Sequence, residues 1–260
     1  MNRWARSRRR IILAVIFLTA VVFIALPLYR FFYRTPTCFD GKNNGDETGV
    51  DCGGSCQRLC SPESLPLVQR GDPRVLTIAT STFEVVAVVE NPNFASIKRA
   101  KYVIEIYGNG VIPIKTIEGE IYIPSGLKFA VFEGPFVLEP DVIPTRAAIK
   151  WQESEFIFEK NVERSQQLVA RGTFFSRLDP PRLEAKIENT SREWISNVDV
   201  TALLYDKNGN IFAAAKTFID RIGPQGKAGA LFSWPNSFII EPASIEILIK
   251  IIPDRSLLNP

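Results

Sequence analysis

Two patterns of hydrophobic and polar positions divide the chain. An apolar run extends from Ile11 to Tyr29 without a charged residue. Beyond residue 74, short segments alternate apolar and polar residues, as in LEAKIEN (183–189) and VDVTALLY (198–205). A period of two places successive side chains on opposite faces of a β-strand, and no segment in this region has convincing helical spacing. The pattern predicts one N-terminal helix followed by an all-β region.

The alternation also predicts which side chains face a core. The expected inward residues are Leu183, Ala185 and Ile187; Val198, Val200, Ala202 and Leu204; Ile117, Ile121 and Ile123; and Ile245, Ile247, Ile249 and Ile251. The intervening residues, such as Glu184 and Lys186, are expected on the opposite face. Asn109-Gly110 and Asn208-Gly209 predict tight turns between strands.

The apolar run is long enough to cross a membrane. A helix over 11–29 extends about 28 Å, close to the thickness of the hydrocarbon layer. Arginines dominate the preceding tail, at positions 3, 6, 8, 9 and 10, and such a cluster favours a cytoplasmic N-terminus. The alternative is a cleaved signal peptide, but its apolar core is shorter and ends at a small-residue cleavage site. We therefore expect a basic cytoplasmic tail over 1–10, a transmembrane helix over 11–33 and everything after residue 34 outside the cytoplasm.

Composition excludes several classes of function. The net charge of +3 is offset by the N-terminal arginines, so the outer part is nearly neutral and no nucleic acid is expected as a partner. The chain contains no histidine, which removes the commonest general base and catalytic metal ligand. No phosphate loop, nucleophile elbow or dinucleotide fingerprint is present. We expect no enzymatic activity and no catalytic residues.

Three weaker features of the sequence have structural explanations. Glu153 and Glu155 are the nearest pair of carboxylates, but a solvated strand face explains them better than glycosidase chemistry. Three tryptophans lie in the β region, at Trp151, Trp194 and Trp234. Packing in a sandwich explains them better than a sugar-stacking platform would. Asn189-Thr190-Ser191 fits a glycosylation sequon, although the asparagine is also an expected residue at a strand end.

All four cysteines lie in one short segment, at Cys38, Cys52, Cys56 and Cys60. Structural zinc sites prefer C-x2-C pairs, and the spacings here do not match. The predicted location outside the cytoplasm favours two disulfides, because thiols oxidise there. Four cysteines allow three pairings, and the spacing does not choose among them.

The acidic loop DGKNNGDETGVD (40–51) has the length of an EF-hand calcium loop. Asp40, Asn44, Asp46, Thr48 and Asp51 fall at positions 1, 5, 7, 9 and 12 of that pattern, with Gly45 at position 6. Lys42 departs from the pattern, since it places a cation where a ligand belongs. A disulfide-held polar turn is the alternative. Calcium is the one cofactor that the sequence suggests.

The same segment resembles a short motif of secreted and surface proteins, C-x-[DN]-G-x-x-[ND]-G-x-E-T-x-x-D-C-G-G-x-C. The matching residues are Cys38, Asp40, Gly41, Asn44, Gly45, Glu47, Thr48, Asp51, Cys52, Gly53, Gly54 and Cys56. The resemblance implies an extracellular, disulfide-bearing module over 34–60 and does not imply an enzyme.

Residues 61–74 contain three prolines and no periodicity, and they predict a semi-extended linker. The rest of the chain repeats itself. Glu90-Asn91, Ile97 and Tyr107 match residues at an offset of 98; Pro124, Gly126, Phe132 and Pro135 match at 100; and Glu139-Pro140 matches at 102. Ordered matches predict two copies of a small two-sheet sandwich, each of about seven strands, over 75–160 and 172–252, followed by a tail over 253–260.

The second copy resembles the FxLyD and late-embryogenesis-abundant type 2 group of immunoglobulin-like sandwiches. The resemblance rests on Ile187 and Asn189 at a strand end, on Leu204-Tyr205-Asp206 with Gly209, and on the turn from Ile222 to Gly226. The turn departs from the Pro-Gly of the pattern, and the first copy keeps only Val89, Asn91 and Ile106-Tyr107. The resemblance implies two tandem immunoglobulin-like β-sandwiches with a structural or accessory role.

These observations predict a single-pass membrane protein whose C-terminal domains lie outside the cytoplasm. We expect a non-catalytic envelope protein that presents its sandwiches for structural or protein-interaction roles, with an envelope or surface protein as partner. The alternative is a calcium-dependent adhesin or ligand-binding surface protein.

Overall fold

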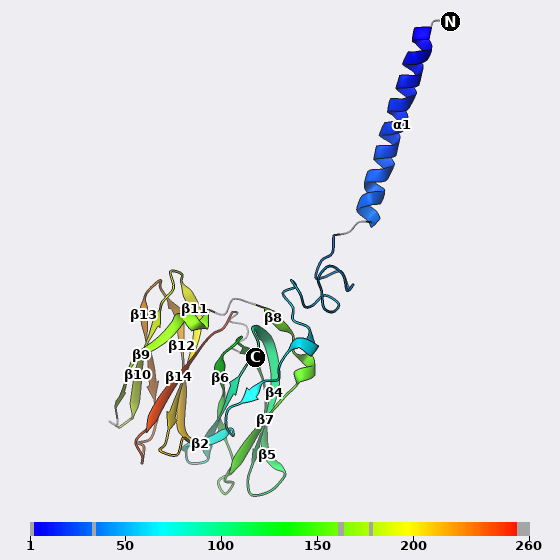
Figure 1. Ribbon diagram of the computed structural model, residues 1–260. Coiled ribbons are helices and arrows are strands. Elements are labelled where there is room, and N and C mark those ends of the chain that lie inside the picture. The colour runs from blue at the N-terminus through cyan, green and yellow to red at the C-terminus, as the bar shows by residue number, and fades with distance from the viewer. Residues whose placement is uncertain (1–2, 33–34, 161–163, 177–178, 254–260) are drawn as a thin grey trace.

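The computed structural model describes residues 3–32, 35–160, 164–176 and 179–253. One long helix precedes an all-β body (Figure 1). The elements are α1 (Arg3–Phe32), β1 (Val68–Gln69), β2 (Arg74–Ala79), β3 (Thr82–Glu90), β4 (Ala95–Tyr107), β5 (Pro113–Ile123), β6 (Lys128–Val137), β7 (Arg146–Trp151), β8 (Phe158–Lys160), β9 (Leu168–Ser176), β10 (Arg182–Asn189), β11 (Ile195–Tyr205), β12 (Ile211–Ile222), β13 (Lys227–Ser233) and β14 (Ser244–Ile251). The predicted all-β class is confirmed. Apart from Pro253, the expected C-terminal tail lies outside the described residues.

Helix α1 begins inside the basic tail instead of after it. Its first described residue is Arg3, because arginine is a good helix former and no breaker separates it from the apolar run. The candidate span Arg8–Arg30 has 23 residues and extends about 34 Å. None of its apolar window is buried against the rest of the described chain. The helix is therefore long and apolar enough to cross a membrane, while Tyr33, the predicted end of the span, lies outside the described residues.

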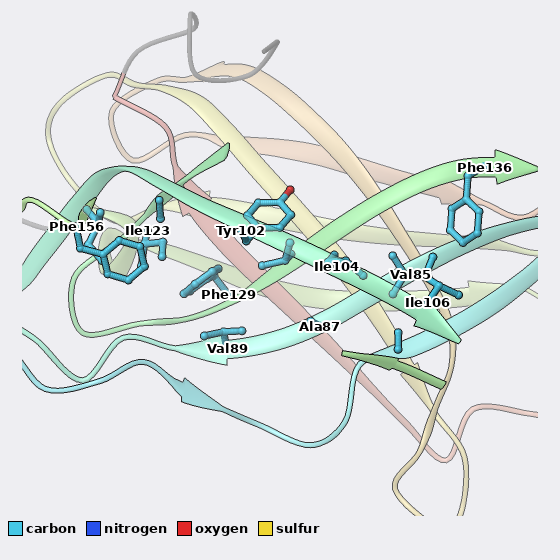
Figure 2. Packing of buried hydrophobic residues seen from close by; sticks show 14 of the residues in the cluster. Val85, Ala87, Val89, Tyr102, Ile104, Ile106, Ile123, Phe129, Phe136 and Phe156 are labelled. Atoms are coloured by element: carbon cyan, nitrogen blue, oxygen red, sulfur yellow. The ribbon is translucent and has the colours of Figure 1, made fainter. Parts of the chain in front are cut away.

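The first half of the body, residues 68–160, contains two antiparallel sheets. In its inner sheet β3 is central, with β6 on one side and with β1 and β2 on the other. In its outer sheet β4 is central, with β5 on one side and with β7 and β8 on the other. Side chains from both sheets meet in one core (Figure 2). The core includes Val85, Ala87 and Val89 of β3, Ile104 and Ile106 of β4, and Phe129 of β6.

The second half, residues 165–251, is built in the same way. Its outer sheet has the order β13-β10-β9 and its inner sheet the order β12-β11-β14. The inward faces predicted for β10 and β11 are confirmed: each residue is at most 1% exposed, namely Leu183, Ala185, Ile187, Val198, Val200, Ala202 and Leu204. The four predicted isoleucines of β14 are partly buried against the same core.

The two inner sheets face each other, so that four sheets lie side by side (Figure 1). Their contact is a third apolar cluster, in which Leu76, Val86, Val88 and Ala130 of the first half meet Leu203, Ala214 and Leu248 of the second. Each inner sheet therefore buries both of its faces. This explains the continuous apolar run Val85–Val89 in β3, because a strand covered on both sides needs no polar face.

Equivalent asparagines lie at the ends of β3 and β10, Asn91 directly after β3 and Asn189 as the last residue of β10. Asn91 and Asn189 are both fully buried. Each side-chain amide donates a hydrogen bond to the carbonyl oxygen of the residue four positions later, Ala95 or Glu193, and another to a turn carbonyl, Pro124 or Gly223. The offset of 98 read from the sequence therefore joins residues with the same bonds.

The offset of 100 is wrong by one residue. The backbone N–H of Gly126 donates to Asn93, and that of Gln225 donates to Ser191, so Gly126 corresponds to Gln225 and not to Gly226. Both residues have positive φ, 61° and 52°. Similarly, Phe132 pairs with β3 as Leu231 pairs with β10. The offset of 100 pairs two glycines because they are the same residue type. The turn instead requires a positive φ at one position, and in the second half a glutamine adopts it where glycine is usual.

Residues 61–74 are bound to the first half and do not form a free linker. Strand β1 pairs with β3. The side chain of Asn93 accepts a hydrogen bond from the N–H of Leu65 at 2.7 Å and donates one to its carbonyl oxygen at 2.8 Å. Leu67 packs against the core. The segment has no periodicity because its partners are side chains and a strand edge contributed by distant residues.

The second half also begins earlier than residue 172. Strand β9 starts at Leu168, which pairs with Asn189 of β10. Before it, the hydroxyl of Ser165 accepts a hydrogen bond from the N–H of Ile251 at 2.9 Å. Any fragment of this half must therefore start before Ser165.

Candidate functional site

The cysteine-rich module contains two interlocked disulfides. Cys38 is bonded to Cys56 and Cys52 to Cys60, with sequence separations of 18 and 8. The predicted disulfides are confirmed, and the pairing is now known. All four sulfurs are engaged, so the zinc alternative does not hold. Each crosslink restricts the unfolded chain, and together they compensate for a segment with few apolar residues.

The loop 40–51 is held by its own carboxylates. Both oxygens of Asp51 accept from the N–H of Gly41, at 3.0 and 3.1 Å. Asp40 accepts from the N–H of Lys42 at 3.0 Å and from the side-chain amide of Asn44 at 2.9 Å. Asp40 thus contacts Asn44 directly, and Asp51 contacts the loop at Gly41, the residue after Asp40.

The other two predicted ligands have different partners. Asp46 accepts from the N–H and the hydroxyl of Ser55, at 3.0 and 2.7 Å. The hydroxyl of Thr48 donates to Glu63 at 2.6 Å. The predicted ligands are thus not gathered at one place, and calcium binding stays a prediction.

Hydrogen bonds lower the pKa of two of these carboxyls. The side-chain bond from Asn44 is the main cause for Asp40, and the bond from the Ser55 hydroxyl is the main cause for Asp46. Bonds that favour the charged form hold both groups ionised at neutral pH. The loop therefore carries negative charge within a module that two disulfides crosslink.

The module is attached to the first half by an extension of its outer sheet. The N–H of Leu59 donates to Phe158 at 2.9 Å, and the N–H of Lys160 donates to Gln57 at 2.7 Å. The ammonium group of Lys160 also donates to the carbonyl oxygen of Gly54 at 2.7 Å. The module and the first half are consequently joined through β8 as well as through residues 61–67.

Four of the remaining sequence candidates, Glu155, Trp151, Trp234 and Asn189, have structural partners. Glu155 forms a salt bridge with Lys101 at 2.8 Å. Trp151 packs against the core of the first half and Trp234 belongs to the core of the second, so they share no platform. Asn189 is buried, and its amide donates to backbone carbonyls, which leaves it inaccessible to a glycosylating enzyme.

A buried ion pair lies between the two halves and was not expected. Lys250 of β14 and Asp199 of β11 are 6% exposed each, and Lys250 Nζ lies 3.5 Å from Asp199 Oδ2. Asp199 Oδ1 has no hydrogen-bond partner among the described residues. Burial lowers the pKa of Lys250, and the charge of Asp199 opposes this effect. The alternation placed both residues on an outer face, but that face is covered by the first half.

The signal that could have revealed this interface is the loss of alternation. Ala202, Leu203 and Leu204 are consecutive and all fully buried, and Val85–Val89 behave alike in β3. A run of this kind indicates a strand covered on both faces. It would have shown that neighbouring polar residues on the same strand face another part of the protein.

Polar contacts surround the apolar interface. Glu246 forms a salt bridge with Lys128, Arg74 donates to Asn210, and Asn236 donates to the carbonyl oxygen of Ile78. Each contact joins one half to the other, so the two halves are docked at several points.

No protein-family model matches this chain, and no curated protein matches it.

Proposed function

We propose that this protein is a single-pass membrane protein that presents two tandem immunoglobulin-like sandwiches outside the cytoplasm. Its role is non-catalytic, in structure or in binding an envelope or surface protein. The observation that carries the proposal is a helix with no part of its apolar window buried, followed by a module with two disulfides. The first needs an apolar medium and the second an oxidising compartment.

The tandem arrangement is supported by the pairing order of the strands. Each half has two sheets with one central strand each, namely β3 and β4 in the first half and β10 and β11 in the second. The strands on either side of these central strands occupy equivalent places in the two halves. The buried asparagines Asn91 and Asn189 stand at equivalent bends. We propose on this basis that both halves descend from one sandwich of the FxLyD and late-embryogenesis-abundant type 2 kind.

A presenting role is supported by the way the parts are joined. The module adds to the outer sheet through Leu59 and Lys160, Asn93 holds Leu65, and the two halves share an apolar cluster. Such contacts hold the module and both sandwiches in a fixed arrangement. A scaffold held at a fixed place near the membrane is suited to binding another protein.

The orientation follows from the basic residues before the span. We expect a reporter enzyme that needs an oxidising compartment to be active when fused after Pro260, because the arginines keep the N-terminus in the cytoplasm. The measurement is reporter activity beside that of a cytoplasmic reporter fused at the same position. Replacing Arg6, Arg8, Arg9 and Arg10 by glutamine is the matched control, and it should give a mixture of orientations. Activity of the cytoplasmic reporter alone in the unaltered chain would contradict the proposed topology.

Calcium binding is the second candidate function, and one observation favours it. Asn44 Oδ1 is buried without a hydrogen-bond partner among the described residues, and its amide nitrogen contacts Asp40. The backbone N–H of Asn44 also donates to Glu47 at 3.2 Å. An unpartnered oxygen on a residue that contacts two carboxylates is the kind of position that a hard cation occupies. Lys42 opposes such binding by its charge. We propose a weak site, with Kd of about 10⁻⁴–10⁻³ M as in extracellular modules.

Calorimetric titration of the full chain with calcium tests this candidate. We expect Asp40→Ala to abolish the binding heat and Lys42→Asp to strengthen binding, since one change removes a ligand and the other removes a repelling charge. Asp141→Ala, in the loop between β6 and β7, is the control for a general loss of acidity. Absence of heat in the unaltered chain and in Lys42→Asp alike would contradict a calcium site.

A further inference from the structure

We infer that a cavity between the two halves binds a methylated ammonium group. The cavity has a volume of about 110 Å³ and is lined by β2 and β3 of the first half and by β12 and residues 234–238 of the second. This inference goes beyond the proposed function and does not depend on membrane topology or on calcium.

Three aromatic side chains form one side of the cavity. They are Phe212, Trp234 and Phe238. The rings of Trp234 and Phe238 have centroids 5.2 Å apart and are inclined by 62°, and those of Phe212 and Phe238 are 5.4 Å apart and nearly perpendicular at 88°. Rings inclined in this way present faces in different directions, although one face of Phe238 is stacked on Phe175 at a centroid distance of 6.1 Å. The indole is fixed, because Trp234 Nε1 donates to the carbonyl oxygen of Ala214 at 2.9 Å.

The opposite side of the cavity provides a carboxylate. Glu84 of β3 is half-buried and has neither a hydrogen bond nor an ion pair with any described side chain. Gly134 makes room for it: a Cβ at that glycine would lie 2.9 Å from Glu84 Cγ. Burial raises the pKa of Glu84, as expected for a carboxyl without a partner. A cation in the cavity would supply the missing charge.

The chemistry of the lining selects the type of cation. Aromatic faces attract cations that are weakly hydrated, and methylated ammonium groups are recognised by such cages. Among the described residues of the lining, Glu84 is the only carboxylate, whereas calcium sites usually combine several charged oxygen ligands. A primary ammonium group is strongly hydrated, so it would lose more hydration among aromatic rings than a methylated one. A methylated ammonium group needs only one balancing charge and apolar contact.

The position of the cavity connects its occupancy to the docking of the two halves. Asn236, part of the lining, donates to the carbonyl oxygen of Ile78 across the interface. The cavity adjoins the start of β3, whereas Asn91 and the Asn93–Leu65 contact follow its end. Strand β3 has nine residues and extends about 30 Å. The cavity thus lies far from the segment that leads to α1, which favours a soluble ion over the headgroup of a lipid in the anchoring membrane.

Titration of the full chain in maltoside micelles with tetramethylammonium chloride tests the inference. We expect saturable binding of one ion in calorimetry, accompanied by a shift of the Trp234 indole N–H resonance. Sodium chloride controls for ionic strength, and tert-butanol is a neutral probe of similar size. Because the charge contributes to binding, tert-butanol should bind about tenfold more weakly than tetramethylammonium, or weaker still. The variant Glu84→Gln should likewise bind tetramethylammonium about tenfold more weakly or weaker still. Glu118→Gln, which removes an exposed carboxylate from β5, should bind as the unaltered chain does.

Two further arms complete the experiment. Phe212→Leu should weaken binding while keeping the position apolar, and Glu84→Gln covers the case in which that variant does not fold. Choline and glycerophosphocholine distinguish a soluble ion from a lipid headgroup, and preference for either supports the shared chemistry. Unchanged binding in Glu84→Gln, equal binding of tert-butanol, or no saturable binding by the folded chain would overturn the inference.

Discussion

Replacing Val200 by aspartate is expected to unfold the second half. Val200 is fully buried in the core of that half, where β11 lies between β12 and β14. An aspartate there would place a charge among apolar side chains without a partner, at a cost of more than about 4 kcal/mol. The measurement is the loss of cooperative unfolding of the second half, followed by circular dichroism and by the fluorescence of Trp234.

Ser196→Asp is the control for this change. Ser196 lies on the same strand but is exposed, so an aspartate there stays hydrated and should leave the free energy of unfolding nearly unchanged. A folded Val200→Asp variant with the same unfolding midpoint as Ser196→Asp would show that the inward face of β11 is wrongly assigned.

Removing Lys250 is expected to have the second largest effect. Lys250→Ala would leave Asp199 buried without an ion-pair partner, and breaking a buried pair from one side costs about 3–5 kcal/mol. Urea denaturation of the full chain measures this loss. Lys101→Ala removes the lysine of an exposed pair, for which we expect a much smaller effect because solvent screens such pairs.

The double variant Lys250→Met with Asp199→Leu separates the cost of an unpaired charge from the contribution of the pair. Apolar residues of similar volume remove both charges together, and such replacements are often neutral or stabilising. We therefore expect the double variant to be more stable than Lys250→Ala. Equal destabilisation by the two would indicate that the interface depends on the ion pair itself, since the double variant leaves no unpaired charge and keeps side chains of similar volume.

The acidic loop shows how far a local motif can be taken. Within the loop, Asp40 contacts Asn44 and Asp51 contacts the N–H of Gly41, and calcium binding by these residues stays a prediction. The spacing did not anticipate the partners of Asp46 and Thr48, which are Ser55 and Glu63. Those partners lie beyond the loop, and the disulfides fold them back against it. A local motif predicts contacts among its own residues, whereas the disulfides determine which residues from outside the loop contact it.

The cavity lined by Glu84 was not predictable from sequence. Glu84 lies in β3, and Phe212 and Trp234 belong to the other half of the body. Each residue alone has an ordinary explanation, since tryptophan and phenylalanine are common in cores and glutamate is common on strand faces. Only the docking of the two inner sheets brings them to one place. Sites formed between distant segments leave no local spacing to detect.

By itself, the sequence determined the elements and their sides. An uncharged apolar run makes a helix, and strict alternation directs Leu183, Ala185 and Ile187 into a core, because local backbone geometry fixes where successive side chains point. The tertiary structure alone decided which cysteines pair, what holds residues 61–74 and which outer faces are covered. Asp199 and Lys250 alternate as solvated residues do, yet they are buried because the inner sheet of the second half packs against that of the first. Alternation records a side chain's direction relative to its own sheet, and only long-range packing determines what lies beyond that face.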